Sequence, residues 1–390
     1  MKICSCIAEY NPFHLGHLKH IDYIKTVLGA DKVIVVMSGN FTQRGEPAVL
    51  DKFTRAKHAI IAGADLVIEL PTVFATANAE TFATGAVNLI HSLGCVDQLC
   101  FGVESGDKNA YLTLATALAN ESKEYKKALK EKLDSGISLA KAKFEALKML
   151  DNAEYDANLL SSPNNILGLE YTKALIKNKS NIEICPMLRT GDHNDIRLKK
   201  GITSASSIRE ILKTGKKRKV KGNLPKFVYK DLAEYPFAFD KLIMASAVSA
   251  TADDLKAIPD CTEGLENRIK ALLKDNLTVT ELVEKVSTKR YPASRVRRIL
   301  LANFLKINQE LISDCLKNKT YAKILAVNKN SKDLISLISK TAQVPVLTRK
   351  SDSTLVKKTA QKAFEIDILA NDLYNLATAQ KTNEHKMDII

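Results

Sequence analysis

Two histidines, His14 and His17, flank Gly16 in the segment NPFHLGHLKHI, directly after the first strand-like run of the chain. Imidazole N–H groups can bind phosphate oxygens, and donors placed in advance stabilise the charge that develops when a nucleophile attacks phosphorus. A glycine lets a phosphate or a base approach the backbone closely. The alternative interpretation is a pair of half-buried core histidines. The choice between the two depends on what the neighbouring segments bring to the same place.

Apolar runs and helical spacings alternate through the first half of the chain, which indicates strands and helices in alternation. Strands are predicted at residues 2–8, 31–39, 65–71, 96–104 and 182–189. Helices are predicted at residues 14–29, 51–64, 79–94, 111–150, 161–177 and 203–213. Strands of this kind, apolar on both faces, are typical of a Rossmann-like α/β domain with a parallel, doubly wound sheet.

The second half of the chain has a different pattern. We place the end of the catalytic domain at Thr214, before the basic segment GKKRKVKGNLPK. From Phe227 to Asn318 the pattern is helical, and residues 321–352 suggest a small strand–helix–strand unit. The prediction is therefore two domains. Residues 1–214 would form an ATP-binding, nucleotidyltransferase-like catalytic domain, and residues 215–390 a mostly helical, basic, RNA-binding domain with a small α/β unit.

Composition excludes several classes of protein. No run of about 18 apolar residues is present, so no membrane association is expected. The seven cysteines show no C-x-x-C spacing, which favours a reducing, cytoplasmic setting without disulfides or structural zinc. The chain carries 58 Lys and Arg against 44 Asp and Glu, yet residues 1–100 hold 8 basic and 9 acidic residues. The positive excess lies after residue 100, as in a basic protein with solvated lysines or one that binds a polyanion.

Polar loops follow several of the predicted strands, at the edge of a parallel sheet where ligands bind. SGNFTQRGEPAVLDKFTRA supplies Gln43, Arg44, Gly45 and Glu46 after the second strand, and FGVESGD follows the fourth. TSASSIRE begins the last helix of this half with serines and an arginine suited to β- and γ-phosphates: Ser204, Ser206, Ser207 and Arg209. Four such loops at one edge favour a nucleotide site over a set of turns and caps.

These segments also carry a resemblance to known proteins. NPFHLGH together with TSASSIRE resembles the nucleotidyltransferase superfamily. The longer segments AEYNPFHLGHLKHI, MSGNFTQRGEPAVLDKFTRA, GADLVIELPTVFA, FGVESGD, SSPNNILGLEYTKAL and TKRYPASRVRRIL resemble the bacterial tRNA(Met) cytidine acetate ligase family through most of the chain. The resemblance implies that ATP and acetate form acetyl-adenylate. The acetyl group then passes to N4 of the wobble cytidine, C34, of elongator tRNA(Met), giving N4-acetylcytidine.

The resemblance also implies particular contacts with ATP. Its implied ATP contacts are Ile7, Ala8, Glu9, Tyr10, Asn11, Pro12, Phe13, His14, Leu15, Gly16, His17, Leu18, Lys19, His20, Gly102, Asn165 and Arg189. We also predict phosphate contacts for Ser206, Ser207 and Arg209. His14 and His17 are the predicted catalytic pair. After Arg189 the chain reads TGDHND, where the family has a longer Gly-rich segment, so His193 receives no role. Mg²⁺ is expected to arrive with ATP, because no acidic metal cluster stands out.

Basic segments of the second half suit an RNA substrate. Residues 211–230 contain eight Lys or Arg and no acid. The segment KRYPASRVRR gathers basic side chains around Tyr291, of which we assign four to tRNA binding: Lys289, Arg290, Arg295 and Arg298. The prediction is a tRNA acetate ligase that needs no obligatory protein partner. Two alternatives remain: a small-molecule adenylyltransferase or carrier-protein acetate ligase, and a non-catalytic RNA-binding protein.

Overall fold

The computed structural model of the chain describes residues 1–120, 122–137, 139–149, 155–189, 203–232, 235, 238–275, 277–288 and 290–390. Its strands are β1 (Ile3–Ala8), β2 (Lys32–Ser38), β3 (Leu66–Leu70), β4 (Gln98–Val103), β5 (Glu183–Leu188), β6 (Ala322–Val327), β7 (Val346–Leu347) and β8 (Asp388–Ile389). They form one sheet in the order β5-β4-β1-β2-β3-β6-β7, with β8 paired to β6. The first five strands are parallel, as predicted, and the α/β class of the fold is confirmed.

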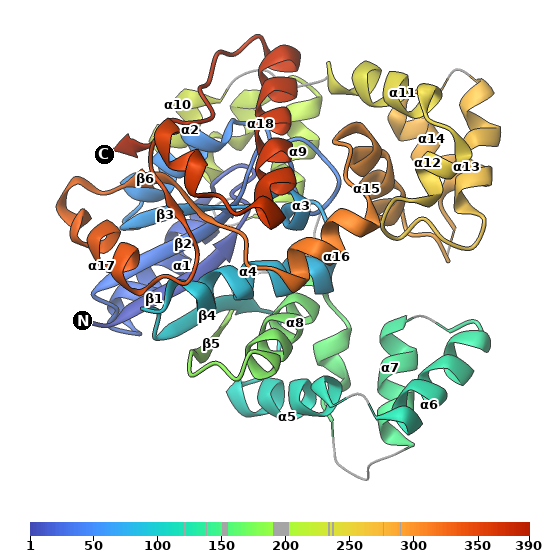
Figure 1. Ribbon diagram of the computed structural model, residues 1–390, viewed down its shortest axis with the longest axis horizontal. Coiled ribbons are helices and arrows are strands. Elements are labelled where there is room, and N and C mark those ends of the chain that lie inside the picture. Colours follow the sequence, from blue (N-terminus) through green and yellow to red (C-terminus); the bar gives the residue numbers. More distant parts are fainter. Residues whose placement is uncertain are drawn as a thin grey trace.

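Helices cover both faces of this sheet (Figure 1). The helices before the fifth strand are α1 (Leu15–Thr26), α2 (Lys52–Ile61), α3 (Thr72–Ala75), α4 (Ala79–Leu93), α5 (Lys108–Ala119), α6 (Lys123–Asp134), α7 (Leu139–Lys148) and α8 (Pro163–Lys177). Alternate residues of β1 and β2 enter two separate cores. One core contains Ile21 of α1 and Ala56 of α2, and the other contains Val87 of α4 and Leu169 of α8. The sheet is therefore doubly wound.

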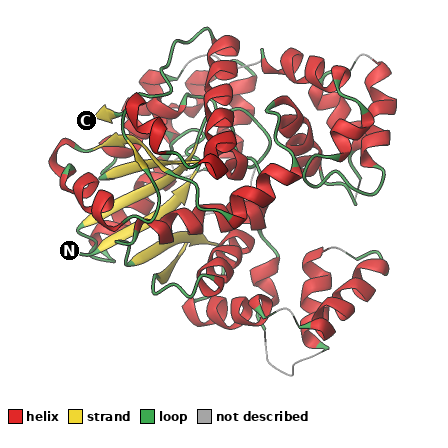
Figure 2. Ribbon diagram, viewed as in Figure 1, coloured by secondary structure: helices red, strands yellow, loops and turns green. Residues whose placement is uncertain are grey.

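The segment after β5 is helical. α9 (Ala205–Lys213), the 3-10 helix η2 (Lys217–Asn223) and α10 (Lys226–Asp231) pack on the core that contains α1 and α2. A helical lobe follows, formed by α11 (Phe239–Ser249), α12 (Ala252–Lys256), α13 (Leu265–Leu272), α14 (Val279–Val286) and α15 (Ala293–Phe304), and α16 (Gln309–Lys317) then packs against α3. Figure 2 shows this part of the chain as red helices beside the yellow sheet. The helical character predicted for residues 227–318 is confirmed for its described residues.

The last 70 residues return to the sheet. α17 (Asp333–Thr341) lies between β6 and β7, and α18 (Lys358–Thr378) crosses toward the lobe (Figure 1). The strand–helix–strand unit predicted here exists, but it is not separate, because β6 pairs antiparallel with β3 of the first half. A strand left at the edge of a sheet has unpaired backbone groups, and β6 satisfies those of β3. The sheet therefore crosses the predicted domain boundary at residue 214.

A buried cluster of charged side chains connects the C-terminal segment to the first half of the chain. Lys52 Nζ lies 2.7 Å from Glu69 Oε1 and 2.6 Å from Glu384 Oε2, and Lys323 bonds both carboxylates. Two lysines and two glutamates thus join α2, β3, β6 and the C-terminal tail. Burial alone would raise the pKa of Glu69, but the charges of Lys323 and Lys52 together lower it. Among the described residues, no helix is long and apolar enough to cross a membrane.

Candidate nucleotide-binding site

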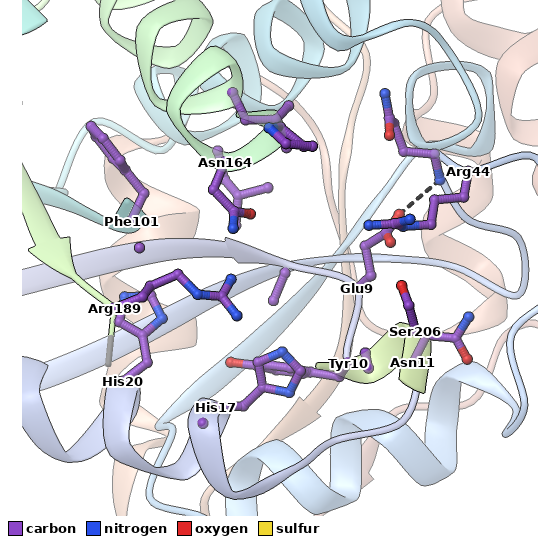
Figure 3. Close-up of a pocket in the computed structure, with 18 of the residues that line it drawn as sticks. Glu9, Tyr10, Asn11, His17, His20, Arg44, Phe101, Asn164, Arg189 and Ser206 are labelled. Carbon is purple, nitrogen blue, oxygen red and sulfur yellow. Dashed lines mark hydrogen bonds between the residues drawn. The ribbon is translucent and has the colours of Figure 1, made fainter. Parts of the chain in front are cut away.

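A cavity of about 520 Å³ opens where β1, β4 and β5 end, between the starts of α1, α4, α8 and α9 (Figure 3). Its volume lies within the range of about 300–1,000 Å³ that small-molecule sites occupy. Fourteen of the predicted ATP contacts line it, namely Ile7, Ala8, Glu9, Tyr10, Asn11, His14, Gly16, His17, Lys19, His20, Gly102, Arg189, Ser206 and Arg209. The polar loops expected at the carboxyl edge of the sheet therefore meet in one place.

The two histidines of the HxGH motif form a stacked pair at the start of α1. Their ring centroids are 3.7 Å apart, with the planes inclined by 18°. The backbone N–H of Gly16 donates to His14 Nδ1 at 3.0 Å, and that of His14 donates to His17 Nδ1 at 3.2 Å. Because each Nδ1 accepts a hydrogen bond, each proton of the neutral ring belongs on Nε2. The start of the helix thus fixes two Nε2–H donors.

Burial keeps His17 and His20 neutral. It lowers the pKa of His17 well below 6.5, and His14, Arg189 and His20 add to the effect. Burial likewise lowers the pKa of His20 to about 4, and His20 Nε2 lies 3.2 Å from Cys100 Sγ. At neutral pH these rings are hydrogen-bonding groups and carry no charge. They suit charge that develops on a phosphate oxygen, a role that needs oriented donors rather than proton transfer.

A buried arginine positions the loop that leads from β1 to the motif. The guanidinium of Arg55, on α2, donates to the carbonyl oxygens of Glu9 at 2.6 Å, Leu50 at 2.9 Å and Ser38 at 3.0 Å, and also to that of Gly39. The next residue, Tyr10, turns the chain with a φ of 49°. A bulky residue in this region is strained and persists only where its surroundings hold it. Arg55 thereby ties the ends of β1 and β2 together.

Arg189 and Gly102 shape one end of the cavity. A Cβ placed on Gly102 would lie 3.1 Å from Cγ and 3.2 Å from Cδ of Arg189, so the glycine allows the arginine side chain to cross it. Asn165, predicted beside them, is 1 % exposed and lies behind the wall. Its Oδ1 accepts from the N–H of Glu104 at 2.8 Å, while Asn164 lines the cavity instead. Asn165 is thus placed to shape the wall from behind.

The start of α9 forms another wall. Ser206 and Arg209 line the cavity, and Arg209 Nη1 donates to the carbonyl oxygen of Asn11 at 2.9 Å. Ser207 is buried, and its N–H donates to the capping Ser204 Oγ at 3.1 Å. Pro12, Phe13, Leu15 and Leu18, all in the predicted ATP segment, do not line the cavity. These four positions are placed to hold the loop and helix rather than to face a ligand.

The predicted tRNA-binding residues differ in exposure, although shared acidic partners hold Arg290, Arg295 and Arg298 near one another. Arg298 of α15 lines the cavity, and its side chain is 14 % exposed, with Nη2 lying 3.7 Å from Asp260 Oδ2. Arg295 Nε donates to the carbonyl oxygen of Asp260 at 2.8 Å. Arg290 is exposed and pairs with Glu263 at 2.6 Å. Lys289 lies outside the described residues, as does His193. Arg295 and Arg298 are three residues apart, a spacing that places both on one face of α15. They do not form an exposed basic face, because the start of this helix packs against the cavity.

Several lining residues were not predicted as ATP contacts. Gln43 and Arg44 come from the loop after β2, Ser294 from α15, and Phe82 and Tyr171 from α4 and α8. One of these contributions could have been predicted from the sequence, because the lining positions of α8 recur every four residues. Residues 163, 167 and 171 all line the cavity, as one face of a helix would. Ser294 and Arg298 needed the tertiary structure, since more than 80 residues separate them from α9.

The cavity residues do not have the composition of a metal centre. Within the part of the chain that the structure describes, no group of three or more His, Cys, Asp or Glu side chains could hold a metal ion. Glu9 is the single carboxylate among the described residues of the cavity, and one carboxylate does not make a metal centre. The cationic lining instead suits a polyanion: Lys19, Arg44, Arg189, Arg209 and Arg298.

Fold and site together define a nucleotidyltransferase of the HxGH type. Comparison with known proteins agrees, since the model of the HIGH Nucleotidyl Transferase family matches residues 1–388. The chain is 38 % identical over 387 residues to the tRNA(Met) cytidine acetate ligase of Clostridium perfringens, covering 96 % of this chain and 95 % of the relative. It is 40 % identical over 389 residues to that of Thermoanaerobacter sp., covering 97 % and 96 %.

Solved structures agree with this. The crystal structure of Thermotoga maritima TmcAL bound with alpha-thio ATP matches with a TM-score of 0.91 at 30 % identity, over 100 % of both chains. The apo form of that protein matches with a TM-score of 0.93 at the same identity and coverage. The chain belongs to the family of tRNA(Met) cytidine acetate ligases.

Proposed function

We propose that this chain is an ATP-dependent tRNA(Met) cytidine acetate ligase. Acetate attacks the α-phosphorus of ATP, pyrophosphate leaves, and the cytidine N4 amine then takes the acetyl group from the mixed anhydride. The observation that carries the proposal is the stacked pair of His14 and His17 inside a cationic cavity of nucleotide size. The similarity of the whole chain to relatives named for this reaction supports the choice of acid and acceptor.

The lining residues suggest how ATP would lie. Gly102, Phe101 and Arg189 offer a narrow end for the base and ribose, while Ser206 and Arg209 lie at the start of a helix that suits the β- and γ-phosphates. The α-phosphorus would then lie over the Nε2–H donors of the histidine pair. Mg²⁺ would arrive bound to the triphosphate, and we derive no step through it. Binding the reactants in line supplies much of the rate, because association becomes intramolecular.

An RNA acceptor needs a basic surface near the cavity. α9 brings Arg209 into the cavity and leads directly into η2, where four basic side chains are exposed: Lys216, Arg218, Lys219 and Lys221. We propose this basic cluster, together with Arg290, as the surface that binds tRNA phosphates. Such contacts supply affinity that falls with salt, by about 0.7–0.9 in log–log slope for each contact. Arg295 and Arg298 are better placed to contact the acceptor end of the cavity than RNA outside it.

The test is incubation of the purified chain with ATP, labelled acetate and total tRNA, followed by nucleoside analysis. We expect ATP-dependent N4-acetylcytidine at position 34 of elongator tRNA(Met), and none in a transcript with uridine at that position. Acetate-dependent ATP–pyrophosphate exchange without label in tRNA would refute the proposal in favour of a small-molecule or carrier-protein enzyme. Absence of exchange would favour the non-catalytic RNA-binding protein.

A further inference from the structure

Glu9 is out of keeping with the rest of the cavity. Among the lining residues that the structure describes it is the single carboxylate, whereas a lysine and four arginines line the same space. ATP brings about four negative charges, and two like charges 4 Å apart repel by roughly 4 kcal/mol at an effective dielectric constant of 20. A carboxylate here opposes nucleotide binding. A role in the chemistry would account for its presence.

The position of Glu9 is fixed on both its backbone and its side chain. Arg55 holds its carbonyl oxygen at 2.6 Å, and its Oε1 accepts from the backbone N–H of Gln43 at 2.7 Å. Within the described residues, no other hydrogen bond of its carboxylate is recorded. One oxygen is therefore engaged in positioning, and the other is left for a ligand in the cavity. A group held in this way loses little freedom when a substrate arrives.

Glu9 also lies at the end of the cavity that suits the acceptor. Figure 3 shows Arg189 and His20 at one end and Glu9 with Arg44 at the other. Ser294 and Arg298 of the helical lobe line the same cavity. Glu9 directly follows β1, which leads to His14 and His17, where the α-phosphorus and the acetyl group bonded to it would lie. The carboxylate would then lie on the side of the reacting carbonyl away from the base.

We propose that Glu9 is the general base of the transfer half-reaction, an inference that rests on the proposed function. The N4 amine of cytidine attacks the carbonyl carbon of acetyl-adenylate. As the N–C bond forms, the bond between that carbon and the phosphate oxygen breaks, and AMP leaves with the electron pair. The proton lost by N4 passes to the Glu9 carboxylate. An aromatic amine is a weak nucleophile, and positioned bases typically contribute about 10²–10⁴ in rate.

Glu9→Gln separates this role from a structural one. The amide oxygen of glutamine can still accept from the Gln43 N–H, so the loop contact survives while the base is lost. Glu310→Gln is the control, because it removes one negative charge from an exposed position of α16 that does not line the cavity. Glu9→Asp retains the carboxylate on a shorter side chain.

The experiment measures two fates of preformed acetyl-adenylate in single-turnover reactions. One is transfer to elongator tRNA(Met), and the other is capture by hydroxylamine, a strong nucleophile that needs no base. For Glu9→Gln we expect transfer to fall by about 10²–10⁴, with hydroxamate formation changed less than about tenfold. The ratio of the two should be unchanged in Glu310→Gln and partly restored in Glu9→Asp.

Two outcomes would overturn the inference. Equal transfer in wild type and Glu9→Gln would mean that the leaving phosphate takes the proton. An equal loss of transfer, hydroxamate formation and pyrophosphate exchange, or a higher requirement for Mg²⁺ in exchange, would place Glu9 in the ATP step instead. Failure of the wild-type chain to acetylate tRNA at all would refute the proposed function, and that result is distinct from both.

Discussion

Replacing His17 by alanine tests the central feature of the site. The substitution removes one Nε2–H donor, the ring that stacks on His14 at 3.7 Å, and the Nδ1 that accepts the His14 N–H at 3.2 Å. The first loss concerns the transition state, because the donor faces the cavity. The other two concern the folded protein, because they cap the start of α1. Kinetics and stability should therefore respond by different amounts.

The two effects can be estimated separately. A preorganised donor to developing negative charge is worth about 10²–10³ in rate, or roughly 3–4 kcal/mol. Loss of a single capping contact costs about 1 kcal/mol of unfolding free energy. Acetate-dependent ATP–pyrophosphate exchange should therefore fall by two to three orders of magnitude in a protein that remains folded. Because the ring is neutral, the size of the defect should be the same at pH 7 and pH 8.

The assay is pyrophosphate exchange at saturating acetate and ATP, with urea unfolding on the same preparations. His91→Ala is the matched control, since His91 contacts Ser180 Oγ at 3.0 Å in the last turn of α4, and does not line the cavity. Its exchange rate should remain that of the wild type. Near-normal exchange by His17→Ala would remove the histidine pair from the mechanism. A defect that vanishes at high pH would mean that a charged imidazole acts there.

Three further perturbations follow from the structure. His20→Gln should remove a loss of stability that acid causes. The pKa of His20 is about 4 in the folded protein, so below pH 6.5 the unfolded chain binds the proton more readily than the folded one. This lowers the unfolding free energy by at most about 2 kcal/mol at pH 5, which urea unfolding at pH 7 and 5 would measure. Gly45→Ala should raise KM for ATP and lower the melting temperature, because the new Cβ would lie 2.7 Å from backbone atoms of Arg297 and Arg298; equal values would refute the packing argument. Glu384→Gln should cost about 3–5 kcal/mol of unfolding free energy by leaving two buried lysines with one carboxylate, whereas exposed Glu310→Gln should cost nothing measurable.

Local sequence patterns were sufficient for the first half of the fold. β-branched runs such as residues 33–36 can only be buried on both faces, and the helices between such strands must then cover the sheet. The HxGH segment and the TSASSIRE segment follow strands, so the parallel arrangement alone predicted that they meet. Fourteen lining residues of the cavity came from this reasoning together with the family resemblance.

The sequence could not show contacts that depend on the return of the chain. β6 has the composition of any buried strand, and nothing local indicates that its neighbour is β3, more than 250 residues earlier. The same holds for α15, whose arginines have the spacing of an exposed basic helix. Gly45 decides the outcome there, since the absence of a Cβ lets the backbone of Arg297 approach the loop after β2. Arg298 is buried by tertiary packing, which helical periodicity cannot predict.

The loop after β2 explains how these distant parts act as one site. Its Gln43 N–H fixes Glu9, and its Glu46 contacts both Arg209 of α9 and Arg297 of α15. Farther along, Ala48 accepts from the Tyr374 hydroxyl of α18 at 2.9 Å. Every wall of the acceptor end thus contacts a segment that continues into α2, whose Arg55 holds the backbone of Glu9. The loop after β2 therefore connects α9, α15 and α18 to the carboxylate that would accept the proton.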